Sequence, residues 1–270
     1  MPSYAITGAT ILAGDELEPI PDATVIVEDG KIVAVGRSAE MSVPPNAEHV
    51  DARGCVLTPG FIDAHVHISF YDPHDVVAGG VTTVRDLGAP PQEIFELAAR
   101  SKSSDFDGPT ILAAGPMLTA PGGYPARAAW ARAGTALELA DPNEARAAVA
   151  ALAARATIIK ITLNPPVGPV LDDDTLRAIV DTAHDLGLRV TGHIWGLDQL
   201  RRALDAGIDE LAHVLMSAEP IPDDVIARMT NASVAVVPTL SIRKGHDRDI
   251  AIDNVRRFRS TGGTILYGTD

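Results

Sequence analysis

Residues 58–67 read Thr-Pro-Gly-Phe-Ile-Asp-Ala-His-Val-His, and the pattern of the chain changes within them. From Phe61 onward, short apolar runs alternate with longer segments of helical periodicity. Side chains two residues apart on a strand point to the same face of a sheet, so His65 and His67 would project together. This stretch therefore predicts the first strand of a strand–helix repeat, with two imidazoles on one face.

Eight apolar runs beyond this point have the composition of buried parallel strands. They are residues 61–68, 82–87, 110–115, 158–163, 190–195, 210–214, 235–240 and 265–270. Helical patterns lie between them, most clearly at 142–155, 173–186, 198–206, 223–229 and 249–260. Asp141 before Pro142 predicts an N-cap, and Gly187 and Gly207 lie where helices end. The alternation predicts an α/β fold, a (β/α)8 TIM barrel, with a doubly wound sheet as the alternative.

The first part of the chain, residues 1–59, follows a different pattern of short β segments. They are residues 5–12, 23–28 and 31–36. The pair Asp29-Gly30 between the last two is a strong signal for a two-residue hairpin. These strands are too few to enclose a core alone, so the sequence predicts a small sheet beside a barrel formed by residues 60–270.

The composition of the 270 residues restricts the classes of function. A net charge of −14 argues against nucleic acid, whose phosphates require clustered Lys and Arg. No apolar run reaches the roughly 18 residues of a membrane span. Cys55 is the single cysteine, and the N-terminus lacks the pattern of a signal peptide, which predicts a cytoplasmic location. The 4 % aromatic content predicts a core of Val, Ile, Leu and Ala.

Polar residues lie near the ends of several predicted strands, where a TIM barrel places its active site. His193, His213 and Asp270 lie near the ends of the fifth, sixth and eighth strands. Lys160 lies inside the fourth strand, where a buried ammonium needs a partner or loses its proton. Among metal ions its neutral amine can take up carbon dioxide, and the carbamate can bridge two cations. Each histidine alone fits a core position, but their joint placement predicts a metal centre.

Four other histidines fall in predicted loops or helices and are predicted to lie at the surface: His49, His74, His184 and His246.

The motifs taken together resemble the amidohydrolase superfamily. Residues 58–67 resemble its first-strand signature. Four later motifs follow in the family's order, namely Ile159-Lys160-Ile161, Gly192-His193, Ala212-His213 and Gly268-Thr269-Asp270. The chain is most similar to the imidazolonepropionase-like amidohydrolases and related metal-dependent dipeptidases. The resemblance covers nearly the whole chain and implies that residues 1–59 form half of a small β-sandwich.

The resemblance also implies two divalent metal ions, with zinc as the default. The spacing alone leaves manganese, iron or a single-metal site open. The implied ligands are His65, His67, His193, His213, carboxylated Lys160 and Asp270. The first two histidines and Asp270 would hold one ion, the other two histidines the second, and Lys160 would bridge them. Asp270 and Lys160 are the expected catalytic residues, because Asp270 would take a proton from metal-activated water and pass it to the leaving nitrogen.

Substrate contacts are less evident in the sequence. Tyr124, Arg127 and Arg243 are predicted to face the mouth and bind a substrate carboxylate, with ordinary surface positions as the alternative for the arginines. Tyr124 departs from the Gly-Gly-His loop of the related dipeptidases. Asn164-Pro165-Pro166 also departs from the small-residue loop expected after the lysine.

The expected function is hydrolysis of an amide, peptide or cyclic amide C–N bond in a small molecule or dipeptide. Two alternatives keep the metal centre: a non-catalytic metal-binding or assembly subunit, and a deaminase. The family continues beyond the position of Asp270 with an eighth helix and the rest of the sandwich. A complementing C-terminal polypeptide is therefore expected, either as a separate chain or as the rest of a longer one, with a degenerate fragment as the alternative. An oligomer is also expected.

Overall fold

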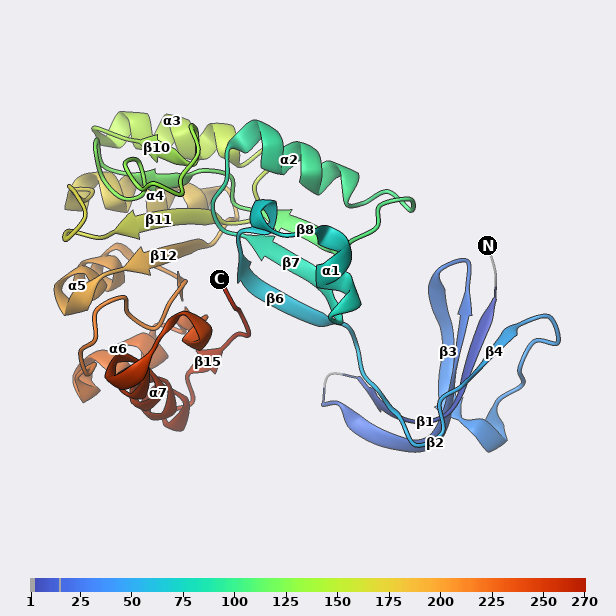
Figure 1. Cartoon of the computed structure of the whole chain (residues 1–270). Coiled ribbons are helices and arrows are strands. Elements are labelled where there is room, and N and C mark those ends of the chain that lie inside the picture. The colour runs from blue at the N-terminus through green and yellow to red at the C-terminus, as the bar shows by residue number, and fades with distance from the viewer. Residues whose placement is uncertain (1–2, 15) are drawn as a thin grey trace. The chain divides into compact units, whose positions relative to one another are not determined.

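The computed structural model describes residues 3–14 and 16–270, and these form two compact units, Met1–Gly60 and Phe61–Asp270 (Figure 1). Each unit has its own sheet structure and its own apolar core. Within the described residues, no helix is both long and apolar enough to cross a membrane.

The first unit is a twisted five-stranded sheet with the order β3-β2-β1-β4, in which β5 also pairs with β1. Its elements are β1 (Tyr4–Ala13), β2 (Glu18–Glu28), β3 (Lys31–Arg37), η1 (Ser38–Glu40), β4 (Glu48–Asp51) and β5 (Val56–Leu57). Asp29 and Gly30 both have positive φ, as the predicted tight hairpin requires. The sequence did not predict β4 or β5, because β4 is exposed along its whole length and β5 has only two residues.

The second unit is built on parallel strands. They are β6 (Phe61–Val66), β7 (Val81–Asp86), β8 (Thr110–Ala113), β9 (Met117–Thr119), β10 (Ala136–Glu138), β11 (Ile159–Leu163), β12 (Val190–Ile194), β13 (Glu210–Leu211), β14 (Ala235–Val236) and β15 (Thr264–Ile265). One sheet has the order β6-β7-β8, and the other runs β10-β9-β11-β12-β13-β14-β15. Apart from β10, the strands of both sheets lie in chain order without the reversal of a doubly wound sheet, which argues against that alternative.

The last three strands are shorter than predicted. The strands β13, β14 and β15 have two residues each, although single hydrogen bonds continue beyond them. Ala212 N donates to Gly192 O, and Val237 N donates to Leu211 O, each at 2.9 Å. Backbone hydrogen bonds between these strands thus become fewer toward the mouth of the predicted barrel.

Helices connect the strands of this unit (Figure 1). They are η2 (Ile68–Phe70), α1 (Pro73–Ala78), α2 (Pro91–Arg100), α3 (Pro142–Leu152), α4 (Asp173–Asp185), α5 (Gly196–Ala206), α6 (Asp223–Asn231), η3 (Leu240–Ile242) and α7 (Gly245–Ser260). Asp141 caps α3 as predicted, accepting from the backbone of Asn143 and Glu144 at 2.7 and 3.0 Å. Gly207 ends α5 in the left-handed conformation, also as predicted. The short helix α1 and the uncapped α2 were not predicted.

The core of the second unit lies on both sides of its strands. All five residues of β11 and all five of β12 are buried. Around them pack the inward faces of the helices, such as Leu176, Ile179 and Leu200. Because strands covered on both faces cannot shift register without exposing apolar side chains, residues at their ends have fixed positions.

The chain after β15 runs beside β6. Ala64 N donates to Tyr267 O at 2.9 Å, and Asp270 N donates to His65 O at 2.7 Å. Gly268 permits this approach, because a Cβ atom there would lie 2.2 Å from a methyl of Val237 and 3.1 Å from His65 N. The backbone of residues 267–270 is therefore fixed against the first strand of the unit.

Asp63 holds these two segments together. Its buried carboxylate accepts from His65 N at 3.0 Å, from Thr269 N at 3.2 Å and from Thr269 Oγ1 at 2.7 Å. Asp63 therefore fixes His65 and also Thr269, the residue next to Asp270. Asp63 is thus placed to set the separation between an imidazole and a carboxylate of the predicted metal centre.

We expect the substitution Asp63→Ala to lower the free energy of unfolding by about 2 kcal/mol, because one buried donor and two partly buried donors lose their acceptor. Chemical denaturation of the purified protein measures this change. Asp181→Ala, on the exposed face of α4, is the matched control and should change stability by less than about 0.5 kcal/mol. Equal effects of the two substitutions would show that the Asp63 contacts contribute little.

Candidate metal centre

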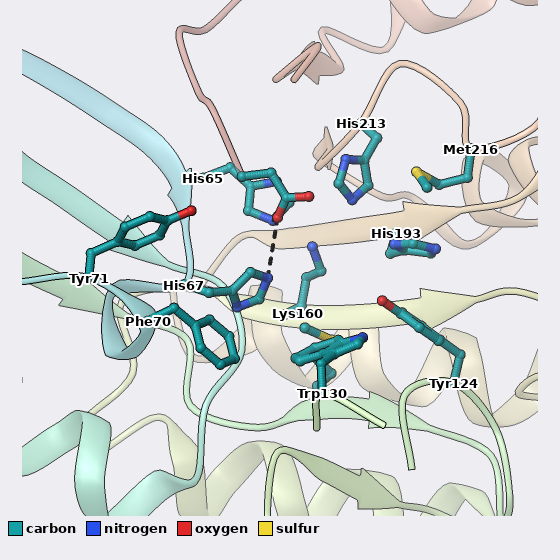
Figure 2. A pocket seen from close by; sticks show the side chains of 12 residues that line it. His65, His67, Phe70, Tyr71, Tyr124, Trp130, Lys160, His193, His213 and Met216 are labelled. Carbon is teal, nitrogen blue, oxygen red and sulfur yellow. Dashed lines mark ion pairs between the residues drawn. The ribbon is translucent and has the colours of Figure 1, made fainter. Parts of the chain in front are cut away.

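The six residues predicted as metal ligands lie around one pocket with a volume of about 230 Å³ (Figure 2). They are His65, His67, Lys160, His193, His213 and Asp270. Strands β6, β11 and β12 carry His65, Lys160 and His193, and the segments that follow β6, β13 and β15 carry the other three. Residues spread over more than two hundred positions of sequence are thereby brought to one place.

Backbone carbonyls fix the ring orientation of His65 in β6 and of His67 just after it. His65 Nδ1 lies 2.7 Å from Ala212 O, and His67 Nδ1 lies 3.0 Å from Gly88 O. A carbonyl oxygen can only accept, so each Nδ1 carries the proton and donates. Each neutral ring therefore presents the lone pair of Nε2 to the pocket, which is how metal-binding imidazoles are oriented in proteins.

The other two histidines are also oriented by neighbours. His213 Nδ1 lies 2.8 Å from Thr239 Oγ1, which leaves Nε2 available. His193 Nε2 lies 3.1 Å from the side-chain amide nitrogen of Asn164, which leaves Nδ1 available. Burial lowers the pKa of both imidazoles well below its usual value, and the nearby Lys160 and His65 add to this effect. Both rings are therefore neutral and able to act as ligands.

Asp270 Oδ1 lies 3.1 Å from His65 Nε2 and 3.3 Å from His67 Nε2. Burial, together with the Lys160 charge, lowers the pKa of His65 to about 4, so this ring is neutral at pH 7. Because its Nδ1 faces the Ala212 carbonyl and its pKa is lowered, the His65 ring turns the lone pair of Nε2 toward the Asp270 carboxylate.

A cation resolves that arrangement, since it attracts every lone pair that surrounds it. One ligand atom each from His65, His213 and Asp270 lie within 4.8 Å of one another. Three such atoms at this separation can contact one divalent ion between them. The residues present therefore fit a bound metal ion.

Lys160 is the largest fully buried side chain and is 1 % exposed. Its Nζ has no hydrogen-bond partner among the described residues, and it points toward the space between His193 and the β6 histidines (Figure 2). Burial lowers the pKa of Lys160 from 10.5 to about 7. Glu210, a nearby buried carboxylate, is already paired with Arg85. The amine is thus partly neutral at pH 7, the state that can react with carbon dioxide.

Of the predicted substrate contacts, the structure brings only Tyr124 to the pocket. Its ring lies 4.7 Å from that of His193, and burial raises its pKa to about 12, with a further contribution from Asp270. Arg127 lines a separate cavity. Arg243 donates to the backbone carbonyls of Leu215 and Met216, so its guanidinium is used in holding a loop.

Several pocket residues were not predicted from the sequence. They are Phe70, Tyr71, Met117, Trp130, Met216 and, beside His193, Asn164. Most lie in connecting segments without periodicity, so no local pattern marks them. For Asn164 a signal existed: the chain departs from the expected loop at this position, directly after the strand that carries Lys160.

Parallel strands whose carboxyl ends present imidazoles, an amine and a carboxylate to one pocket define a TIM-barrel-like protein with a candidate metal centre. The model of the amidohydrolase family matches residues 56–254. The chain belongs to the amidohydrolase family. Its fold is therefore of the TIM-barrel-like amidohydrolase type, as the sequence motifs predicted.

Individual relatives agree with this assignment. An uncharacterized protein of Mycobacterium tuberculosis is 32 % identical over 245 residues, covering 82 % of this chain and 59 % of that protein. The imidazolonepropionase of Idiomarina loihiensis is 43 % identical over 63 residues, or 23 % of this chain and 15 % of that enzyme. A crystal structure of a proposed prolidase from Bifidobacterium longum aligns with a TM-score of 0.79 at 27 % identity, covering 100 % of this chain and 74 % of that one. The chain thus spans 59 % of the length of the mycobacterial relative.

The metal-free protein should show a pH-dependent stability that originates in Lys160. Its pKa is lower in the folded than in the unfolded state, so unfolding takes up protons and stability rises with pH between about 7 and 10.5. We expect Lys160→Met to stabilise the metal-free protein, by an amount that is larger at pH 7 than at pH 9.5 by on the order of 3 kcal/mol. Urea denaturation at the two pH values measures the difference. Parallel pH dependence in both proteins would contradict a buried, depressed lysine.

Proposed function

We propose that the unit Phe61–Asp270 is the catalytic part of a metal-dependent amidohydrolase that hydrolyses an amide, peptide or cyclic amide C–N bond. One observation carries the proposal: His65 Nε2 and His67 Nε2 lie 3.1 and 3.3 Å from Asp270 Oδ1, beside a buried Lys160 amine with no hydrogen-bond partner among the described residues. That arrangement is costly in a protein that binds no cation. Membership of the amidohydrolase family supports the same reading.

In this proposal His65, His67 and Asp270 hold one divalent ion, and His193 and His213 hold a second. Lys160, carboxylated on Nζ, would supply carbamate oxygens as further ligands. Four imidazoles in the ligand set favour zinc. The bound ions supply positive charge that lowers the pKa of a water molecule and polarises the amide carbonyl. Two hydrogen bonds join the last segment of the chain to β6: Ala64 N donates to Tyr267 O, and Asp270 N donates to His65 O. They support a closed barrel around this centre.

The protein's own groups would then direct the proton. Asp270 Oδ1 takes a proton from the attacking water and delivers it to the amide nitrogen as the C–N bond breaks. The Ala212 and Gly88 carbonyls hold His65 and His67 in the tautomer that this arrangement needs. The Tyr124 hydroxyl, which stays protonated, can donate a hydrogen bond to the substrate from the pocket wall.

A complementing C-terminal polypeptide, an oligomeric assembly and a cytoplasmic location stay predictions from the sequence. So do the two alternative functions. A non-catalytic subunit would bind metal without turnover, and a deaminase would release ammonia from a ring carbon rather than an amine or amino acid.

Metal analysis and turnover on the purified protein test the proposal together. We expect about two divalent ions per chain and hydrolysis of members of an amide and dipeptide library. Asp270→Asn should reduce kcat by about 100-fold or more, because the proton acceptor is lost. His65→Ala should reduce both metal content and turnover, and chelation should abolish turnover reversibly.

The matched control is His74→Ala, which removes an exposed histidine paired with Asp107 outside the pocket. It should leave metal content and turnover unchanged. Normal metal content with no hydrolysis of any library member would favour the non-catalytic alternative. Full metal binding by His65→Ala would show that the ligand set is wrong.

A further inference from the structure

The pocket has a second surface that takes no part in the proposed metal chemistry. Four aromatic side chains line it beside the ligands: Phe70, Tyr71, Tyr124 and Trp130 (Figure 2). We call this set the aromatic wall. Only 4 % of the residues of the chain are Phe, Trp or Tyr, so four of them at one pocket is a marked concentration.

Two rings of the wall, those of Phe70 and Tyr124, lie beside Trp130. The centroid of its indole lies 6.2 Å from that of Phe70 and 6.1 Å from that of Tyr124, with interplanar angles of 72° and 58°. The wall also reaches the metal centre directly, because Trp130 lies 5.5 Å from the His67 ring and Tyr124 lies 4.7 Å from the His193 ring. A group resting on the wall is therefore only a few bonds from the proposed reacting carbonyl.

The wall is exposed although it is apolar. Phe70 is 53 % exposed, Tyr71 is 55 % exposed and Trp130 is 36 % exposed. Exposed aromatic side chains scattered singly need no explanation, but here they gather at one hollow together with the candidate ligands. Such a surface gains free energy when a ligand covers it, since apolar area is then removed from water.

We propose that the substrate carries a flat aromatic group, one or two carbon atoms from the scissile amide, which packs against Trp130 and its neighbours. This inference rests on the proposed function and names its substrate class. Inclined rings favour another aromatic ring over an aliphatic one of equal size, because edges and faces of opposite partial charge can meet. Met117 and Met216, which also line the pocket, add polarisable sulfur contacts that favour aromatic partners.

A cationic group is the main competitor for an aromatic wall. The proposed site holds divalent ions in the same small pocket, and their charge repels a second cation. The aromatic ring of a neutral substrate experiences no such repulsion. The wall is therefore assigned to a neutral aromatic group rather than to an ammonium.

Calorimetric titration with three compounds that cannot be hydrolysed tests the wall alone. Benzyl alcohol should bind about 3- to 10-fold more tightly than cyclohexylmethanol, and tetramethylammonium should bind more weakly than either. Trp130→Ala should remove the preference for benzyl alcohol, and Trp130→Phe should retain part of it. Trp195→Phe, which changes a tryptophan that lines a different cavity, is the matched control and should keep the preference. Equal binding of the two alcohols, or tighter binding of tetramethylammonium, would overturn the proposal.

Hydrolysis of matched amides separates this proposal from the proposed function. We expect kcat/KM for N-methylphenylacetamide to exceed that for N-methylacetamide by about 10- to 100-fold in the wild type, and by much less in Trp130→Ala. Turnover of both amides with equal kcat/KM would support the hydrolase and overturn the aromatic subsite. Selective binding of benzyl alcohol without turnover of any amide would support the subsite and overturn the hydrolase. Circular dichroism of Trp130→Ala confirms that a lost preference is not lost folding.

Discussion

The arrangement on which the rest of the structure depends is a set of lone pairs directed at one another across a small pocket. Backbone carbonyls hold the protons of His65 and His67 on Nδ1, so Nε2 of each ring can only face Asp270 as an acceptor. Burial lowers the pKa of His65, and the nearby Lys160 amine has no hydrogen-bond partner among the described residues. The Ala212 and Gly88 carbonyls thus orient His65 and His67 toward Asp270. A cation bound between these side chains would attract all three.

The parallel strands make this arrangement rigid. Strands β11 and β12 are buried along their whole length, so the side chains at their ends cannot shift without exposing apolar residues. Asp63 extends this rigidity to the last segment, because its carboxylate binds both the His65 backbone and Thr269. The fold thus supports the pocket through buried hydrogen bonds that are spread over distant parts of the sequence.

Reactivity and recognition come from different parts of the unit. The candidate ligands lie on strands or directly after them, where backbone positions are fixed. The aromatic wall comes instead from connecting segments, namely the region around η2 and the chain between β9 and β10. A barrel-like scaffold can change its substrate by changing such segments while the chemistry of its strand ends stays the same.

The sequence by itself determined the strand–helix alternation and which six side chains would meet, because a parallel sheet brings the ends of successive strands to one edge. It did not determine what surrounds them. Arg127 and Arg243 looked suitable for a substrate carboxylate, yet one lies at another cavity and the other binds loop carbonyls. Trp130 gave no local signal at all, although its side chain lines the pocket. The direction of a side chain in a loop depends on contacts far away in the sequence, and only the tertiary structure decides those.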